Sequence, residues 1–317
     1  MIEIPGLLNY LIFAISMAGI YSVLALGLNI QWGLTGQLNI GVAGFFAVGA
    51  YTAAILSGPD SPNHLGGFGI WFPIALLGGV VMAGLVALVI ALITVNLRTD
   101  YLAIATIGIA EIIRLFFTNE AWLTYGVRGM NVDRPLQSIL PYYNIFSMAF
   151  VVLVVAGVYF LAERLRKGPW GRVLRGIRES EPAVQAAGKN INRFRIEAFV
   201  IGSMFMGLGG GIYAHFVGFI SPEALDPMFT TFLVWVMLIA GGSGSNRGAI
   251  VGAFVIWAVW SLTPLLTGLL PSDMSTQASS LRTLLVGVLL IAILRLRPEG
   301  ILGEIAEIRR ERGSSSQ

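Results

Sequence analysis

Long apolar runs, separated by short polar or glycine-rich stretches, fill almost the whole chain. An α-helix needs about 20 apolar residues to cross a bilayer, and most of these runs come close to that length. They also exclude a membrane β-barrel, whose strands alternate apolar and polar positions over about 10 residues. The pattern predicts an all-α, polytopic membrane protein with eight to ten transmembrane helices. The runs are 7–30, 36–56, 70–97, 101–118, 144–163, 196–220, 229–241, 249–267 and 282–296.

Composition supports this fold class and excludes several functions. Hydrophobic residues make up 56% of the 317 residues and charged residues only 12%, whereas soluble domains carry roughly 25% charge. A nucleic-acid binder and a soluble enzyme are therefore poor matches. The chain has no cysteine and two histidines, which leaves no thiol chemistry and no Cys- or His-rich metal site. We expect no catalytic residue, no metal and no cofactor.

The distribution of Lys and Arg predicts the orientation in the membrane. Nine of the 20 lie in residues 164–195, and short loops rich in these residues stay in the cytoplasm. Counting spans outward from this segment places the amino terminus outside and the carboxyl terminus in the cytoplasm. Sixteen Lys and Arg then fall inside, and only Arg128 and Arg134 fall outside. We expect a multi-pass protein of the cell inner membrane.

Two regions follow from this topology. Residues 1–296 form a transmembrane domain with its large cytoplasmic loop at 164–195. Residues 297–317 form a cytoplasmic tail, in which Ile301, Ile305 and Ile308 share one helical face. This amphipathic tail is suited to lie on the inner leaflet or on a cytoplasmic partner, and its Gly-Ser end is expected to be disordered.

The cytoplasmic loop contains the pattern of a short capped helix between two basic arms. Ser180 is a plausible N-cap, and Glu181 suits the first helical turn. Ala186 and Ala187 continue a face of small residues, and Gly188 suits the position after the helix. The loop either does no more than set the orientation, or presents this helix as a docking element for a cytoplasmic partner.

A polar cluster separates the first two apolar runs. Polar side chains at membrane depth are costly unless they pair or line a wet cavity, and broken helices at such points build transporter sites. The cluster is either a hydrated inner turn with helix caps or a cytoplasmic-side gate that forms part of a substrate path. The residues that would form the path or gate are Gln31, Thr35, Gln37 and Asn39, with Asn29 beside them.

Charged and polar residues inside the other runs are few. Glu111 and Arg114 are three residues apart on a helix and so can pair. This pair is either structural, or faces another subunit, or contacts substrate, or relays protons. We expect His215 to be packed and hydrogen-bonded. The glycines at 207–211 indicate close helix packing, with a hinge as the alternative.

Four segments resemble one known family. GLNIQWGLTGQLNIGVAGFFAVGAY (27–51), GGSGSNRGAIVGA (241–253) and LRLRPEGILG (294–303) are similar to signatures of the branched-chain amino acid ABC permease family, and ESEPAVQAAGKNINRF (179–194) is similar to the coupling loop of ABC importer permeases. The segment 241–253 departs from the family at Asn246 and Arg247. The resemblance implies the fold of an ABC importer permease, with Ser180, Glu181, Ala186, Ala187 and Gly188 at the ATPase contact.

The resemblance also implies a complex and a cargo. A second, non-identical permease subunit, two cytoplasmic ATPase subunits and a periplasmic or lipid-anchored substrate-binding protein would complete the importer. Its small-molecule substrate would be a branched-chain, hydrophobic amino acid, or alternatively urea or an amide. The chain has no G-x-x-x-x-G-K-[ST] motif, so ATP would bind another chain. An ATP-independent secondary transporter or channel is the remaining alternative.

Overall fold

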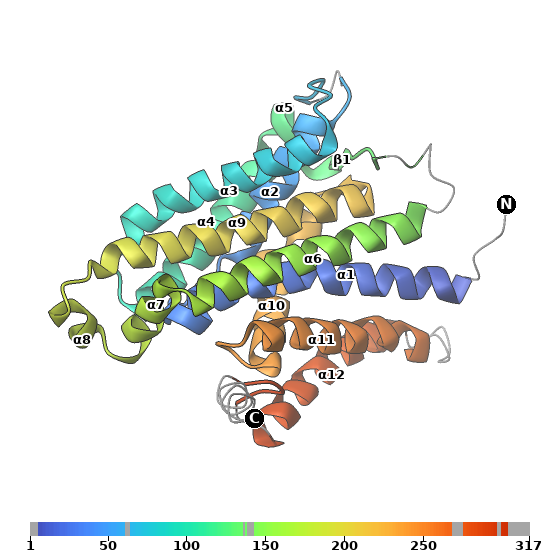
Figure 1. Ribbon diagram of the computed structural model, residues 1–317. Helices are drawn as coiled ribbons and strands as arrows, with labels where there is room; N and C mark the ends of the chain where they lie inside the picture. The colour runs from blue at the N-terminus through green and yellow to red at the C-terminus, as the bar shows by residue number, and fades with distance from the viewer. Residues whose placement is uncertain are drawn as a thin grey trace.

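The computed structural model describes residues 6–60, 64–135, 137, 143–267, 275–296 and 299–303. Each of the nine apolar runs contains one helix, and the predicted all-α membrane fold is confirmed (Figure 1). These helices are α1 (Gly6–Leu28), α2 (Val42–Ser57), α3 (Phe72–Thr94), α4 (Thr99–Asn119), α6 (Tyr143–Lys167), α9 (Ile191–Val217), α10 (Pro227–Gly241), α11 (Asn246–Thr267) and α12 (Ser275–Leu296).

Helices of two lengths build the bundle. Among the described residues, α1 with its continuation to Leu34, α3, α4, α6 and α9 are each long and apolar enough to cross a membrane. The helix α2 and the apolar parts of α10 and α12 are shorter. Helices α1 and α9 are mostly buried, whereas less than half of the apolar span is buried in each of α3, α4 and α6. The core therefore lies along α1, α2 and α9, and the outer helices present apolar side chains to their surroundings.

The close approach of α9 to α2 depends on glycine. A Cβ atom on Gly210 would lie 2.0 Å from the carbonyl oxygen of Phe46, and one on Gly49 would lie 2.1 Å from that of Gly207. Contacts this short leave no room for any other residue type. The glycines at 207–211 thus pack α9 against its neighbours, as expected.

The loop 164–195 is more helical than the sequence predicted, because the basic arms on both sides of the short helix are themselves helical. Helix α6 continues to Lys167 and α9 begins at Ile191, so both arms contribute helical turns. Between them lie α7 (Pro169–Glu179) and α8 (Glu181–Ala186). Helix α7 forms because Gly171, Leu174 and Ile177 recur on one face and are buried, while arginines occupy the other positions.

The opposite end of the bundle carries short elements that the apolar pattern did not predict. They are α5 (Ala121–Thr124), the 3₁₀ turns η2 (Gly126–Arg128) and η3 (Glu223–Leu225), and the antiparallel strands β1 (Met130–Asn131) and β2 (Phe219–Ile220). Two-residue strands leave no periodicity to detect. They join the segments that follow α4 and α9.

The glycine packing predicts a difference between two substitutions. Gly210→Ala is expected to lower the thermal unfolding midpoint of the purified protein, because overpacking against a backbone carbonyl costs about 1–3 kcal/mol. In the control Gly157→Ala, a Cβ would meet nothing within 4 Å, and helix propensity favours alanine by about 1 kcal/mol. Equal midpoints for the two variants would contradict the packing account.

Candidate functional site

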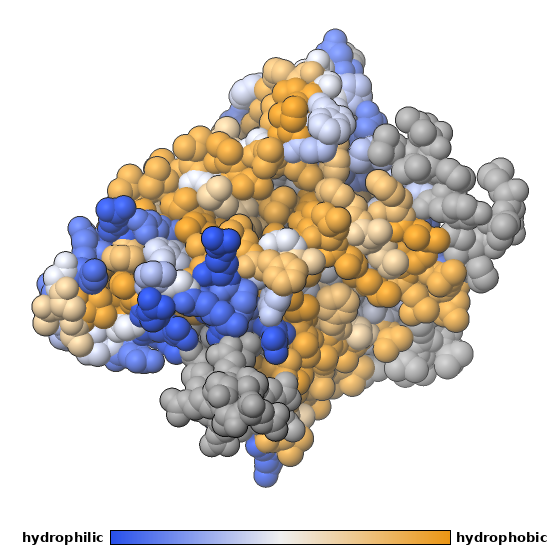
Figure 2. Space-filling view, in the orientation of Figure 1, coloured by the Kyte–Doolittle hydropathy of each residue, from blue (hydrophilic) through white to orange (hydrophobic). Residues whose placement is uncertain are grey.

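The polar cluster at residues 29–39 is buried near the arginine-rich end of the bundle, the end that carries α7, α8 and Arg98. Figure 2 shows hydrophilic side chains gathered at this end and hydrophobic ones along the flank. Helix α1 does not stop at Leu28 but continues as a π-helix, η1 (Asn29–Leu34), and α2 starts only at Val42. The second apolar run was predicted from residue 36, so its first turn is absent.

Gln31 connects three segments by side-chain hydrogen bonds. Its amide nitrogen donates to the carbonyl oxygen of Phe199 at 2.7 Å and to Oγ of Ser203 at 3.1 Å, both on α9. Its amide oxygen accepts from Nδ2 of Asn39 at 2.8 Å. Oδ1 of Asn39 accepts from the backbone N–H of Gly41 at 2.7 Å, just before α2. Gln31 and Asn39 are fully buried, and these bonds offset the cost of burying their amides.

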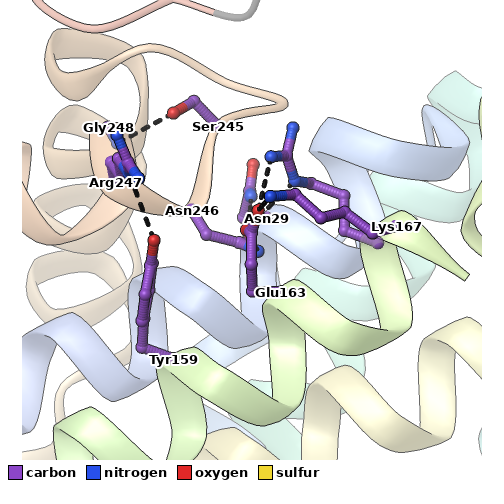
Figure 3. A network of polar contacts seen from close by, with 9 residues as sticks. Asn29, Tyr159, Glu163, Lys167, Ser245, Asn246, Arg247 and Gly248 are labelled. Atoms are coloured by element: carbon purple, nitrogen blue, oxygen red, sulfur yellow. Dashed lines mark hydrogen bonds and ion pairs between the residues drawn. The ribbon is translucent and has the colours of Figure 1, made fainter. Parts of the chain in front are cut away.

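Asn29 begins a second network, which runs toward α11 and α6 (Figure 3). Its Nδ2 donates to Oδ1 of Asn246 at 2.9 Å, and its Oδ1 accepts from the backbone N–H of Gly244 at 2.8 Å. Nδ2 of Asn246 donates to Oε2 of Glu163 at 2.9 Å. The carboxylate of Glu163 also pairs with Arg166 at 2.7 Å. Three segments distant in sequence therefore meet at the start of η1.

Thr35 and Gln37 line a cavity that opens at the same end. Oγ1 of Thr35 donates to the carbonyl oxygen of Gln31 and lies 3.1 Å from Oε1 of Gln37. The cavity has a volume of about 320 Å³, and Glu181 and Arg195 also line it. The four predicted path or gate residues thus form one connected group, and two of them, Thr35 and Gln37, line this cavity.

The α7–α8 hairpin projects at the arginine-rich end. Helix α8 has no buried residue. Ser180 occupies its N-cap position, but its side chain makes no cap hydrogen bond, so the expected side-chain cap is wrong. Gly188 has φ +74° and follows the helix as predicted; its N–H donates to the carbonyl oxygen of Gln185 at 2.9 Å, and that of Lys189 to Val184 at 3.3 Å. Ala186 and Ala187 lie on this exposed last turn.

The hairpin contacts the bundle at several points, and two of its polar contacts lie beside the cavity and η1. Glu181 pairs with Arg195 on α9, with 2.9 Å between Oε2 and Nη2. Nη1 of Arg178, on α7, donates to the carbonyl oxygen of Gly33 in η1. The exposed helix is thereby connected to the same π-helical segment that carries Asn29 and Gln31.

The remaining predicted residues lie away from this end. Arg114 and Glu111 form the predicted ion pair, with 2.5 Å between Nη2 and Oε1. His215 is buried, as expected, and its ring nitrogens lie 2.8 Å from the carbonyl oxygen of Gly211 and 2.7 Å from Oγ of Ser57. Among the described residues, no three His, Asp or Glu side chains gather where they could hold a metal ion.

Sequence reasoning missed Glu163, Arg178 and the role of Asn246. Glu163 offered a signal, because it is the first acid after an uncharged span. In the sequence, Asn246 could be noticed only because it departs from the family pattern, which says nothing of its hydrogen bonds. The bond from Arg178 to Gly33 leaves no trace in the sequence, because its acceptor is a backbone carbonyl.

A substitution in this network tests whether it is energetically important. Asn246→Ala removes a donor from Glu163 and an acceptor from Asn29, both within the buried network, and is expected to lower the free energy of unfolding by about 1–3 kcal/mol. The neighbouring Arg247 is exposed and bonds to the hydroxyl of Tyr159 at 3.2 Å. Arg247→Ala is therefore expected to change stability by less than about 0.5 kcal/mol. Chemical unfolding of both variants measures the two changes. Equal losses in the free energy of unfolding would show that the buried network is not energetically important.

The chain matches known permeases over most of its length. The model of the family described as branched-chain amino acid transport system / permease component matches residues 10–294. The high-affinity branched-chain amino acid transport system permease protein LivM of Salmonella typhimurium is 30% identical, over 90% of this chain and 68% of the relative. The probable LivM of Methanocaldococcus jannaschii is 28% identical, over 90% of this chain and 91% of the relative.

A second group of relatives carries a different name. The LivH permease protein of Escherichia coli is 23% identical, over 91% of this chain and 93% of the relative. No solved structure matches the chain. The family match extends from α1 to α12 and includes the buried polar network and the hairpin. The chain therefore belongs to the family of permease components of branched-chain amino acid transport systems.

Proposed function

We propose that this chain is the permease subunit of an ABC importer that carries branched-chain amino acids across the cell inner membrane. The LivM relatives at 28–30% identity support the cargo. The single observation that carries the ATP-driven mechanism is the α7–α8 hairpin. It leaves every residue of α8 except the half-buried Val184 exposed, and it is bonded to the buried segment η1. A channel or secondary transporter has no need of such an element.

The arginine-rich end faces the cytoplasm in this proposal. Arg98, α7, α8 and the start of α9 lie together at that end, as the positive-inside rule requires. The amino terminus is then outside and the carboxyl terminus inside. Of the proposed tail at 297–317, only residues 299–303 are described. They form turns instead of the expected helix, and the N–H groups of Ile301 and Leu302 donate to the carbonyl oxygens of Ala240 and Gly241 at 2.9 and 2.8 Å.

Two cytoplasmic ATPase subunits supply the energy, and α8 is the contact for one of them. Glu181 and Ala186 belong to α8, Ser180 precedes it, and Ala187 and Gly188 follow it; together they form a compact surface on which all side chains but Glu181 are small. A second permease subunit completes the path across the membrane, as the existence of LivM and LivH relatives supports. A periplasmic or lipid-anchored binding protein delivers the substrate to the outer end.

Motion of α8 reaches the path through α7 and η1. Helix α8 packs on α7, where a Cβ on Gly176 would come within 2.9 Å of the Val184 side chain. Arg178 then transmits displacement of α7 to the carbonyl of Gly33. Because η1 also holds Gln31, the displacement acts on Asn39 and on the start of α2. The group of Gln31, Thr35, Gln37 and Asn39 serves as the cytoplasmic gate.

The apolar composition of the described spans suits a cargo with an apolar side chain. Beyond the cytoplasmic cavity, the described spans offer few charged side chains to hold a substrate tightly. A path of this kind releases its cargo readily, and selectivity then resides in the external binding protein.

Gly188 provides a specific test of coupling. Both Gly188→Ala and Gly188→Trp place a side chain at φ +74°, so both carry a similar backbone strain of about 1–2 kcal/mol. A Cβ there meets nothing within 4 Å, so the fold tolerates either. The tryptophan is expected to block the ATPase contact and lower transport by roughly tenfold relative to alanine, since about 1.4 kcal/mol of lost interaction has that effect.

The measurement is ATP-driven uptake by the complex in proteoliposomes, with ATPase activity recorded in parallel. We expect the Gly188→Trp variant to retain its fold and to lose coupled uptake. Wild-type uptake by Gly188→Trp would show that α8 is not the coupling contact.

Reconstitution also tests the function as a whole. The complex purified through this chain is expected to contain a second permease and an ATPase, and to take up leucine only with ATP and the binding protein. A panel of leucine, isoleucine, valine, urea and a short amide identifies the cargo. ATP-independent uptake by this chain alone would contradict the proposal, as would uptake of urea in preference to leucine.

A further inference from the structure

The three helices with the most exposed apolar faces differ in one respect. Helix α3 carries no charged residue, and α6 has none before Glu163 near its arginine-rich end. Helix α4 carries Glu111 and Arg114 well inside its span. Lipid-facing surfaces avoid charge because its transfer into hydrocarbon is unfavourable. The faces of α3 and α6 therefore suit lipid, whereas that of α4 suits protein.

The ion pair on α4 is held by its own helix but is not enclosed. Nε of Arg114 donates to both oxygens of Glu111, at 3.1 and 3.0 Å, and Nη2 lies 2.5 Å from Oε1. The side chains nevertheless remain 28% exposed for Arg114 and 44% for Glu111. Around them, α4 exposes Ile104, Ile112 and Leu115. This partly exposed ion pair lies within an apolar surface at membrane depth. Its free hydrogen-bond donor and acceptor positions cannot be satisfied by lipid tails.

From these observations we infer that the exposed face of α4, formed by Ile104, Glu111, Ile112, Arg114 and Leu115, binds the second permease subunit. The inference rests on the proposed function and names the surface through which the two permeases meet. The helix rises about 1.5 Å per residue, so Glu111 lies about 18 Å from the start of α4 at Thr99. At that depth a cytoplasmic ATPase or an external binding protein does not reach it, and a membrane-embedded partner does.

The charged residues near this face of α4 determine which side chains a complementary partner surface must carry. Glu223 and Asp226, in the turn at η3, are exposed and act electrostatically on Arg114. Together with Glu111 they give this side an excess of carboxylates over the single arginine. A complementary partner surface presents hydrogen-bond donors or a cation to Glu111 and apolar side chains to the strip around it.

Single-cysteine labelling tests the surface, because the native chain has no cysteine. Ile112→Cys places a thiol on the α4 face, and Leu153→Cys places one on α6 as a control; the native side chains are 65% and 69% exposed. Each variant is labelled with an apolar maleimide in membranes, with and without the second permease co-expressed. We expect the second permease to lower labelling at position 112 by about tenfold and to leave labelling at position 153 unchanged.

The outcomes separate this inference from the proposed function. If the second permease co-purifies and labelling at position 112 stays as high as at 153, the α4 surface is wrong and the function stands. If no second permease co-purifies with this chain, the proposed function fails and the surface with it.

A charge swap separates an interface from a structural ion pair. Glu111→Arg combined with Arg114→Glu keeps an i,i+3 pair within α4 but inverts the charges that face the partner. We expect the thermal midpoint of the isolated chain to fall by no more than the small attraction that the exposed Glu223 and Asp226 exert on Arg114, and the recovery of the second permease to fall by roughly tenfold. Full recovery of the second permease with this variant would show that the pair serves α4 alone.

Discussion

The arrangement of the arginine-rich end depends on the hydrogen bonding of two buried carboxamides in η1, those of Asn29 and Gln31. A buried amide without partners costs roughly 2–7 kcal/mol, so each side chain requires fixed neighbours. Asn29 finds them in Asn246 and the backbone of Gly244, and Gln31 finds them in Asn39, Ser203 and the carbonyl of Phe199. These requirements hold α11, α9 and the start of α2 around one short segment.

The π-helical form of η1 fits this requirement. Its backbone follows directly from α1, and Gly33 leaves space for the Asn29 side chain: a Cβ at Gly33 would lie 2.1 Å from Oδ1 of Asn29. The same residue offers its carbonyl oxygen to Arg178. Single π-helical turns inside α-helices are frequent at functional sites. Here the turn places a buried polar group and an exposed hairpin in direct contact, which is the connection that coupled transport needs.

The sequence predicted those features that depend on composition along the chain. Nine apolar runs located nine helices, and the positive φ of Gly188 followed from its place after a short helix. Gln31 and Asn39 could be selected because amides are conspicuous in apolar surroundings. Their pairing could not be predicted, since it depends on how α9 and the segment before α2 meet in space.

The errors have a common physical cause. The first arm of the cytoplasmic loop was predicted from its charges alone, although Leu174 and Ile177 lie on one helical face and bury it against the bundle. Long-range packing also decides where α2 starts, because the backbone N–H of Ile40 donates to Oγ1 of Thr106 on α4 and that of Ala43 donates to Oγ1 of Thr231 on α10. Charge predicts which side of a membrane a segment occupies, but the apolar positions between the charges determine its structure.

The central claim is that the α7–α8 hairpin acts on the gate through η1, and hydrogen–deuterium exchange on the assembled complex tests it most directly. Exchange is measured with and without a non-hydrolysable ATP analogue. The account predicts that nucleotide changes exchange in the hairpin and also in residues 29–41, with the outer half of α3 unaffected. A change confined to the hairpin, with residues 29–41 identical in both states, would contradict it.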